Sequence, residues 1–309
     1  MNERNQYDIA FRFQSPGLSI LLGFGLLCIC FLFSSFAAGT IFQTFAPDKT
    51  IEELVHTPGG RNLYRMLQAF ANLATWGLAA TFWAIYTGGF RKQLGLQHRT
   101  WTGYFPLAAL TIIVALPFVE WLLIDSESFK LPEALKGVEE WARSQENSSS
   151  GTLVSLLGDT SFSGVFGNII VIAVIPAISE ELFFRGFLLG TLNRMMNAHV
   201  AVWLSAFIFS LVHLQFFGFF SRLLMGALLG YFYLWSGNLL ASMVAHFAHN
   251  LLNILLAVLA IKGILGPGVL QDDFGFGMPV TLCSVLITCV LLYIYRRQAL
   301  KLNTILRYE

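Results

Sequence analysis

The sequence predicts an all-α membrane protein with about eight transmembrane helices. Hydrophobic side chains make up 56% of the 309 residues and charged side chains only 12%, whereas charged residues approach about a quarter of a typical soluble domain. A helix needs about 20 apolar residues to cross roughly 30 Å of hydrocarbon. Runs of that kind recur along the whole chain, so its natural solvent is the bilayer.

The apolar runs give the order of the predicted helices. They cover residues 17–42, 66–89, 103–124, 164–190, 200–216, 221–236, 238–262 and 279–295. The first run has no small-residue cleavage site after it, which favours a retained helix over a signal peptide. The fifth and sixth runs are short, and the Phe-rich stretch between them allows a tilted or re-entrant pair.

Basic residues predict the orientation of these helices. With both termini in the cytoplasm, the short cytoplasmic segments hold a majority of the Lys and Arg residues, as expected for inside loops. These are Arg4, Arg12, Arg91, Lys92, Arg99, Arg194, Arg296, Arg297, Lys301 and Arg307. We therefore expect a multi-pass protein of the inner (cytoplasmic) membrane.

The same pattern divides the chain into five expected segments. A cytoplasmic segment (1–16) precedes three helices (17–124), an extracytoplasmic loop (125–163), a helical core (164–262), and the last helix with a basic tail (263–309). The acidic loop is expected to form an amphipathic helix, followed by a flexible linker at 147–151, where the sequence is Asn-Ser-Ser-Ser-Gly.

Charge and cysteine usage exclude several classes of protein. The net charge is +1 without a basic tract, so no nucleic-acid partner is expected. The four cysteines lack metal-ligand spacing and are interpreted as packing or lipid-facing residues. No internal repeat is visible that would indicate a transporter built from inverted halves.

Polar residues inside the runs indicate a functional site, because an ionisable side chain in hydrocarbon costs from about 2.5 kcal/mol upward. Counted from the cytoplasmic end of each run, the principal ones lie roughly 12 to 18 Å deep. We therefore expect one polar chamber on the cytoplasmic side of the midplane. The polar residues are Glu180, Glu181 and Arg185 in the fourth run, His213 in the fifth, and His246, His249, Asn250 and Asn253 in the seventh.

The two adjacent glutamates are expected to have different roles, because neighbouring helix positions point about 100° apart. Glu181 and Arg185 have i, i+4 spacing with the acid first, which favours a supporting ion pair. Glu180 is then the carboxylate available for chemistry. A buried Glu beside a His can take a proton from water, and His or Asn donors suit an oxyanion. Together they predict a hydrolytic site. Gly-x-Ser-x-Gly and His-Glu-x-x-His are absent.

Three segments resemble the motifs of a known membrane peptidase family. Residues 179–186 are similar to its Glu-Glu-x-x-x-Arg motif, residues 209–213 to Phe-x-x-x-His, and residues 246–250 to His-x-x-x-Asn. Their order and spacing match across about residues 164–255. The chain thus resembles the type II CAAX prenyl endopeptidase and bacteriocin-processing (CPBP) family, which includes Abi-like proteins.

This resemblance implies an eight-helix intramembrane peptidase. In it, Glu180 and His213 activate water, while His246 and Asn250 stabilise the oxyanion. His249 and Asn253 repeat the His-x-x-x-Asn spacing. The first pair is preferred because its distance from Gly237-Asn238 resembles that of the family.

Cofactor and substrate remain open at this point. Glu180, His213 and His246 could supply three ligands of a catalytic zinc ion, yet the same groups also work without metal, and we favour no obligatory ion. The expected substrate is a membrane-bound or lipidated peptide or protein. The alternatives are a catalytically silent membrane scaffold or immunity protein and a small-solute or proton-coupled transporter. The intact polar set disfavours the silent scaffold.

Overall fold

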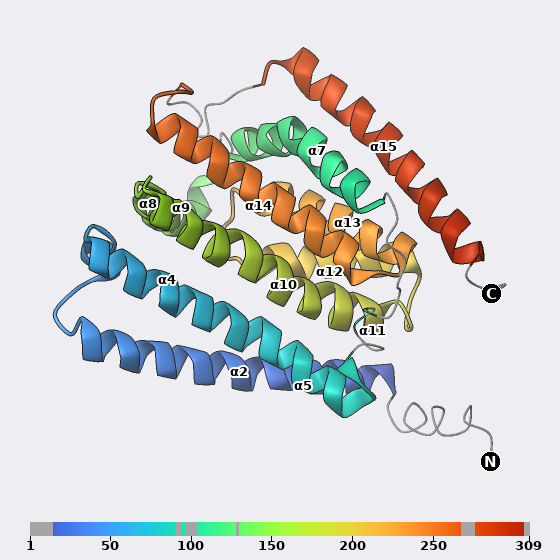
Figure 1. Cartoon of the computed structure of the whole chain (residues 1–309), viewed down its shortest axis with the longest axis horizontal. Coiled ribbons are helices and arrows are strands. Elements are labelled where there is room, and N and C mark those ends of the chain that lie inside the picture. Colours follow the sequence, from blue (N-terminus) through green and yellow to red (C-terminus); the bar gives the residue numbers. More distant parts are fainter. Residues whose placement is uncertain are drawn as a thin grey trace.

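The structure is a computed structural model that describes residues 15–90, 94, 96, 104–127, 130–266 and 276–305. Every regular element in these ranges is a helix, which confirms the all-α prediction. The long helices lie roughly side by side. The connection from α2 to α4, together with α8 and α9, lies at one end of the bundle, and α11 lies at the other (Figure 1).

Each predicted run corresponds to a helix or to a series of contiguous helical segments. The first run is α2 (Pro16–Phe45), the second is α4 (Pro58–Asn72), η1 (Leu73–Gly77) and α5 (Leu78–Thr87), and the third is α7 (Tyr104–Glu127). The fourth comprises α9 (Phe162–Asn168), η3 (Ile169–Val174), α10 (Ile175–Glu181), η4 (Leu182–Leu189) and α11 (Gly190–Leu192). The others are α12 (Ala198–Leu211), α13 (Phe219–Ser236), α14 (Leu239–Ile261) and α15 (Met278–Ile305).

Five of these helical stretches are long and apolar enough to cross a membrane, which makes the chain a multi-pass membrane protein. They are Pro16–Phe45, Phe105–Leu123, Phe162–Leu192, Leu239–Ile261 and Met278–Ala299. The count of eight crossings and the cytoplasmic location of both termini stay predictions. Several basic residues used for the orientation, among them Arg4, Arg12, Arg91 and Arg99, lie outside the described residues.

The predicted fifth run was too long. α12 ends at Leu211, and His213 follows in a tight turn in which the His213 and Leu214 amides bond to the carbonyls three residues earlier. Leu214 has a φ of 53°, which a right-handed helix cannot contain. His213 therefore lies beyond the helix, in the connection to α13.

The prediction of a flexible linker at 147–151 was also wrong. These residues belong to α8 (Lys136–Leu157). Two short elements, α3 (Ile51–Val55) and η2 (Glu133–Leu135), lie at the same end of the bundle as α8. Ser and Gly are weak helix formers, but tertiary contacts hold both flanks of the segment. Glu146 accepts a bond from the Phe217 amide at 3.1 Å, and Leu156 and Leu157 are buried.

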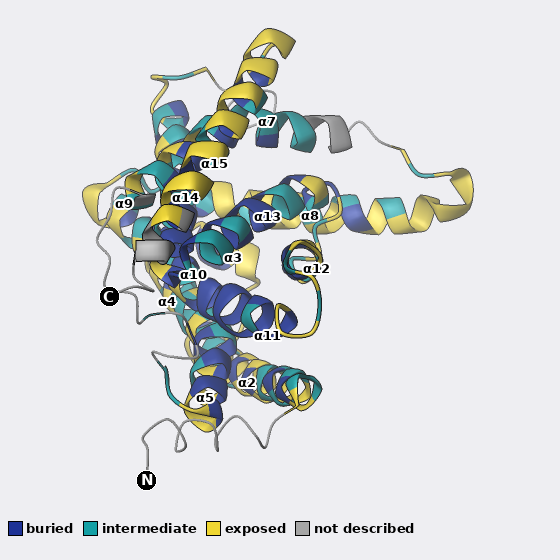
Figure 2. Ribbon diagram, turned by 90° about the vertical axis from the view of Figure 1, so that its right-hand side faces the viewer, coloured by how far each residue is buried: buried dark blue, intermediate teal, exposed yellow. Residues whose placement is uncertain are grey.

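The core surrounds the helical series from α10 to α11. All eight residues of η4 are buried, and its phenylalanines pack against Trp76 and Trp83. Buried residues are concentrated around α10, α11 and α13, while α2 and α15 are largely exposed (Figure 2). Leu21 and Phe36 of α2 are 71% and 78% exposed, as expected for side chains that face lipid.

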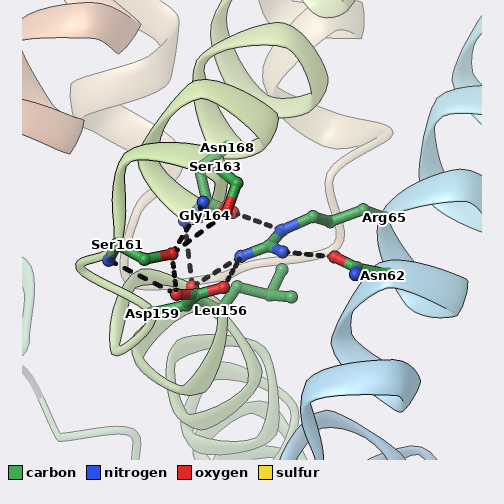
Figure 3. Close-up of polar contacts among 8 residues, drawn as sticks. All are labelled: Asn62, Arg65, Leu156, Asp159, Ser161, Ser163, Gly164 and Asn168. Carbon is green, nitrogen blue, oxygen red and sulfur yellow. Dashed lines mark hydrogen bonds and ion pairs between the residues drawn. The ribbon is translucent and has the colours of Figure 1, made fainter.

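A buried arginine anchors α4 to α8 and α9 (Figure 3). The Nε atom of Arg65 donates to Asn168 at 2.9 Å, and one terminal nitrogen donates to Asn62 at 2.8 Å. The other terminal nitrogen lies 3.3 Å from both the Leu156 carbonyl and the Asp159 carboxylate. Because helix positions seven residues apart share a face, this anchor sets the direction of Asn72, two turns along α4.

Candidate active site

Two π-helical segments directly follow polar residues that lie inside the bundle. η1 begins after Asn72, and η4 begins after Glu181. A third, η3, contains Ile172. π-Turns occur frequently at functional sites, since an extra residue in a turn changes the direction of the side chains around it. Here they let residues of α4, α10 and α14 approach one another inside the bundle.

Glu181 lies at the centre of a buried ionic cluster. Its Oε1 atom accepts bonds from Arg185 at 2.7 Å and from the Nδ1 atom of His246 at 2.9 Å. All three side chains are buried. Arg185 also donates to the Gly226 carbonyl at 3.0 Å, which ties the cluster to α13. The expected Glu181–Arg185 ion pair is therefore present, and it additionally orients His246.

Glu180 has a different environment, although it is the next residue. Its Oε1 atom accepts a bond of 3.1 Å from the side-chain amide of Asn72, in α4. The carbonyl of that amide accepts a short bond from the Ser179 hydroxyl, so Asn72 contacts two consecutive residues of α10. Glu180 forms no salt bridge with any described residue. Its carboxylate thus has a neutral partner and remains available to accept a proton.

His213 is held in one orientation by its neighbours. Its Nδ1 atom lies 2.7 Å from the Phe209 carbonyl, which can only accept, so Nδ1 carries a proton and Nε2 is left as the acceptor. The ring lies near enough to Glu180 and His246 to interact electrostatically with both. The Phe209 ring centroid is 4.9 Å from that of His213 and 6.2 Å from that of His246. Phe209 therefore packs against both imidazoles.

The two His-x-x-x-Asn pairs of α14 differ in their contacts. His249 and Asn253 are bonded to each other at 3.1 Å, as expected for a pair that has a packing role. Asn250 instead donates to the Ile172 carbonyl at 3.0 Å, and an amide nitrogen retains a second N–H for another acceptor. His246 directs Nδ1 to Glu181, so its Nε2 atom remains for the reaction.

The proposed zinc ligands do not form a metal site as they are placed. Across the described residues, no group of three or more His, Cys, Asp or Glu side chains is arranged to hold an ion. The Nδ1 atoms of His213 and His246 have partners, so each ring could bind an ion only through Nε2. No step of the reaction below is therefore assigned to a metal, and the question of metal dependence is put to experiment.

A polar cleft of about 650 Å³ leads toward this site. It is lined by α3, α4, α8 and the segment from η3 to α10. Two lining residues contact the predicted catalytic groups directly. Asn72 donates to Glu180, and the Ile172 carbonyl accepts from Asn250.

Asn72 was not among the residues predicted from the sequence, because it lies in the second run, outside the three motifs. The signal was an amide seven residues into the apolar run 66–89, where Gln68 is the other amide. A buried amide also requires partners, since an unpaired polar group in an apolar medium is costly. The same test that selected Asn250 would have selected Asn72.

Comparison with known proteins supports the family resemblance. Residues 162–252 match the family described as type II CAAX prenyl endopeptidase Rce1-like. The chain is also 32% identical over 84 residues to the uncharacterized protein YpbD of Bacillus subtilis (strain 168). That alignment covers 26% of this chain and 40% of YpbD, so the chain spans less than half the length of this relative. No solved structure matches.

The match confirms that residues 162–252 form an Rce1-like domain, as the three motifs indicated. The domain contains all six predicted site residues, Glu180, Glu181, Arg185, His213, His246 and Asn250. Rce1-like proteins are a protease family, which supports a hydrolase. Asn72 lies outside the matched segment.

Proposed function

We propose that the protein is an intramembrane endopeptidase that hydrolyses a peptide bond of a membrane-associated or lipidated protein or peptide. The observation that carries this proposal is the contrast between adjacent carboxylates in an Rce1-like domain. Glu181 is committed to Arg185 and His246. Glu180 accepts a hydrogen bond from the neutral amide of Asn72, has no salt bridge within the described part of the chain, and interacts electrostatically with His213. A carboxylate in this setting can act as a general base.

In the proposed reaction, Glu180 and Nε2 of His213 orient a water molecule, and Glu180 accepts its proton. The water oxygen bonds to the substrate carbonyl carbon, and the carbonyl oxygen becomes an oxyanion. Asn250 donates a hydrogen bond to it, and so does Nε2 of His246 when that ring carries a proton on both nitrogens, with Nδ1–H held by Glu181. Preorganised donors in a water-poor site stabilise such charge strongly. The C–N bond then breaks, and the proton held by Glu180 passes to the leaving amine. The products are a carboxylic acid and an amine.

A silent scaffold and a proton-coupled transporter are weaker alternatives. A scaffold needs only the ionic cluster of Glu181, Arg185 and His246 to hold its helices together. A scaffold role does not explain why a second carboxylate, Glu180, lies beside a polar cleft. A transporter needs a path to both sides of the membrane. Neither alternative has a specific observation in its favour among the described residues.

Cleavage of a quenched fluorescent membrane peptide by purified protein in lipid nanodiscs tests the proposal. We expect Glu180→Ala and His246→Ala to abolish the fluorescence increase. His249→Ala is the matched control, because His249 lies one turn from His246 but pairs with Asn253. Equal cleavage by the wild type, Glu180→Ala and His246→Ala proteins would show that the assignment is wrong.

The same assay addresses the metal. After exhaustive treatment with a chelator, we expect unchanged turnover, since the donors present do not form a metal-binding group among the described residues. Loss of turnover that added zinc restores would contradict a metal-independent reaction. It would also require His213 to turn away from the Phe209 carbonyl or to bind the ion through Nε2.

A further inference from the structure

The polar cleft has its mouth and its floor at different depths in the bundle. Its exposed rim includes Glu52 and His56 near α3 and Ser148 on α8. Its floor includes Asn72 and Pro176. Both residues lie 14 positions from the first residue of their helix, Pro58 or Phe162, which corresponds to a depth of about 21 Å at 1.5 Å per residue. The cleft therefore extends from the α8 end to the layer of Glu180.

The two ends of the bundle differ in their charged residues. The α8 end mixes acids with bases: it holds the carboxylates of Glu52, Glu53, Glu133, Glu139, Glu140, Glu146 and Asp159 together with the basic groups of Lys49, Arg61, Arg65, Lys130, Lys136 and Arg143. At the other end, the α11–α12 connection and the end of α15 contain basic residues and no acid within the described part of the chain (193–197 and 296–301). Basic residues of short segments are retained in the cytoplasm. In the predicted orientation, with both termini in the cytoplasm, the α8 end and the mouth of the cleft face the extracytoplasmic side.

The chemistry of the cleft wall indicates what it accommodates. Hydroxyl and amide groups of α4 and α8 predominate, and Glu52 is the one formally charged side chain in the lining. Such groups both donate and accept hydrogen bonds, which suits the N–H and C=O groups of an extended polypeptide. The polar lining residues of α4 and α8 are Tyr64, Gln68, Asn72, Asn147, Ser148, Ser149, Thr152 and Ser155.

α8 also contacts the connection that carries His213. Glu146 accepts a bond from the Phe217 amide at 3.1 Å, and the Arg143 guanidinium lies 4.3 Å from the centre of the Phe217 ring. The helix that forms one wall of the cleft is thus fixed to the turn that presents the proposed water-activating histidine. A polypeptide lying along α8 would be led toward that side of the site.

We propose that this cleft binds an extended, uncharged polar segment of the substrate and admits it from the extracytoplasmic side. Asn72 lies at the floor and presents the segment to Glu180. The peptidase reading of the site supplies the reaction, so this inference rests on the proposed function. It concerns where the cleft opens and not the depth of Glu180, so the expectation of a polar chamber on the cytoplasmic side of the midplane stays a prediction.

Thiol labelling in oriented membrane vesicles tests the direction of access without any assay of activity. In a full-length background in which Cys28, Cys30, Cys283 and Cys289 are replaced by alanine, Gln68→Cys and Ser148→Cys place a thiol in the cleft. Met195→Cys, near Arg194 at the other end, is the control. The probe is a charged, membrane-impermeant methanethiosulfonate.

We expect the two cleft thiols to react in right-side-out vesicles and the Met195→Cys thiol to react in inside-out vesicles. Reaction of the cleft thiols only in inside-out vesicles, or in neither preparation, would overturn the inference.

A cysteine at Gln68 blocked with a bulky maleimide should also lower peptide cleavage at least tenfold, whereas the same label at Met195→Cys should not. Cleavage unaffected by the Gln68 label would exclude the cleft as the substrate's route.

Failure of this inference can be separated from failure of the proposed function. If cleft thiols react from the extracytoplasmic side but the wild type cleaves no peptide, the opening is upheld and the peptidase assignment fails. If the wild type cleaves and depends on Glu180 while the cleft thiols react only from the cytoplasmic side, the catalytic site stands and the route is wrong.

Discussion

Glu180 and Glu181 are neighbours in the chain, but the fold gives them opposite environments. Glu181 is completely buried, and one of its oxygens accepts bonds from both Arg185 and His246. Glu180 reaches an amide from α4, at the floor of a polar cleft. The 100° step between successive helix positions directs one carboxylate into the ionic cluster and the other toward the cleft. One residue step along α10 thus separates the supporting carboxylate from the one proposed to react.

The largest expected effect comes from removing the proposed base while its shape is retained. Glu180→Gln should lower the turnover number by about 10²- to 10⁴-fold, the range found for general base catalysis. Its thermal unfolding in detergent should match that of the wild type, since a glutamine can still accept the bond from Asn72. A variant that unfolds at a much lower temperature would mean that Glu180 serves stability.

Replacing the adjacent residue, Glu181, is expected to lower the stability of the fold. Glu181→Ala leaves Arg185 buried without its partner, which costs about 3–5 kcal/mol of folding free energy. Denaturant unfolding in detergent measures this loss. Because an apolar replacement of a whole buried pair is often neutral, the double variant Glu181→Leu, Arg185→Met should recover much of the stability. Recovery of stability without cleavage would assign Glu181 the additional task of orienting His246.

A smaller effect on cleavage is expected from replacing Asn72, the hydrogen-bond partner of Glu180. Asn72→Ala removes a hydrogen bond to a charged group, worth about 1.5–3 kcal/mol, so cleavage should fall at least about tenfold. Asn72→Asp would place a like charge beside Glu180 and should reduce cleavage further at neutral pH. Steady-state kinetics of both variants, with thermal unfolding as the control, would contradict this role if Asn72→Ala cleaves as fast as the wild type.

The smallest effect concerns the distant anchor of α4. The Ser161 hydroxyl and the Arg65 guanidinium donate to Asp159 and hold the pKa of its carboxyl below the usual value. A lowered pKa in the folded state contributes stability above the unfolded pKa of about 3.9, and this contribution is lost as the pH falls through the folded value. Asp159→Asn should therefore show a shallower loss of thermal stability below about pH 4 than the wild type.

Local patterns in the sequence were sufficient for much of the fold and part of the site. Apolar runs determined the helices, because the lengths needed to bury a helical backbone in lipid are fixed by geometry. The Glu181–Arg185 pair followed from i, i+4 spacing, since one turn of a helix brings those positions together in any fold. The three motifs identified the Rce1-like domain, which the family match confirms.

Only the tertiary structure decided which distant groups complete the site. The bonds from Asn72 to Glu180 and from His246 to Glu181 join residues 108 and 65 positions apart, and no periodic pattern encodes such a meeting. The same holds for the helix through residues 147–151 and for the turn at His213, where contacts with other elements override local propensity. The sequence by itself thus determined what must be buried, and the packing of α4, α8 and α14 against α10 and its neighbours decided which buried groups are paired and which one is left to react.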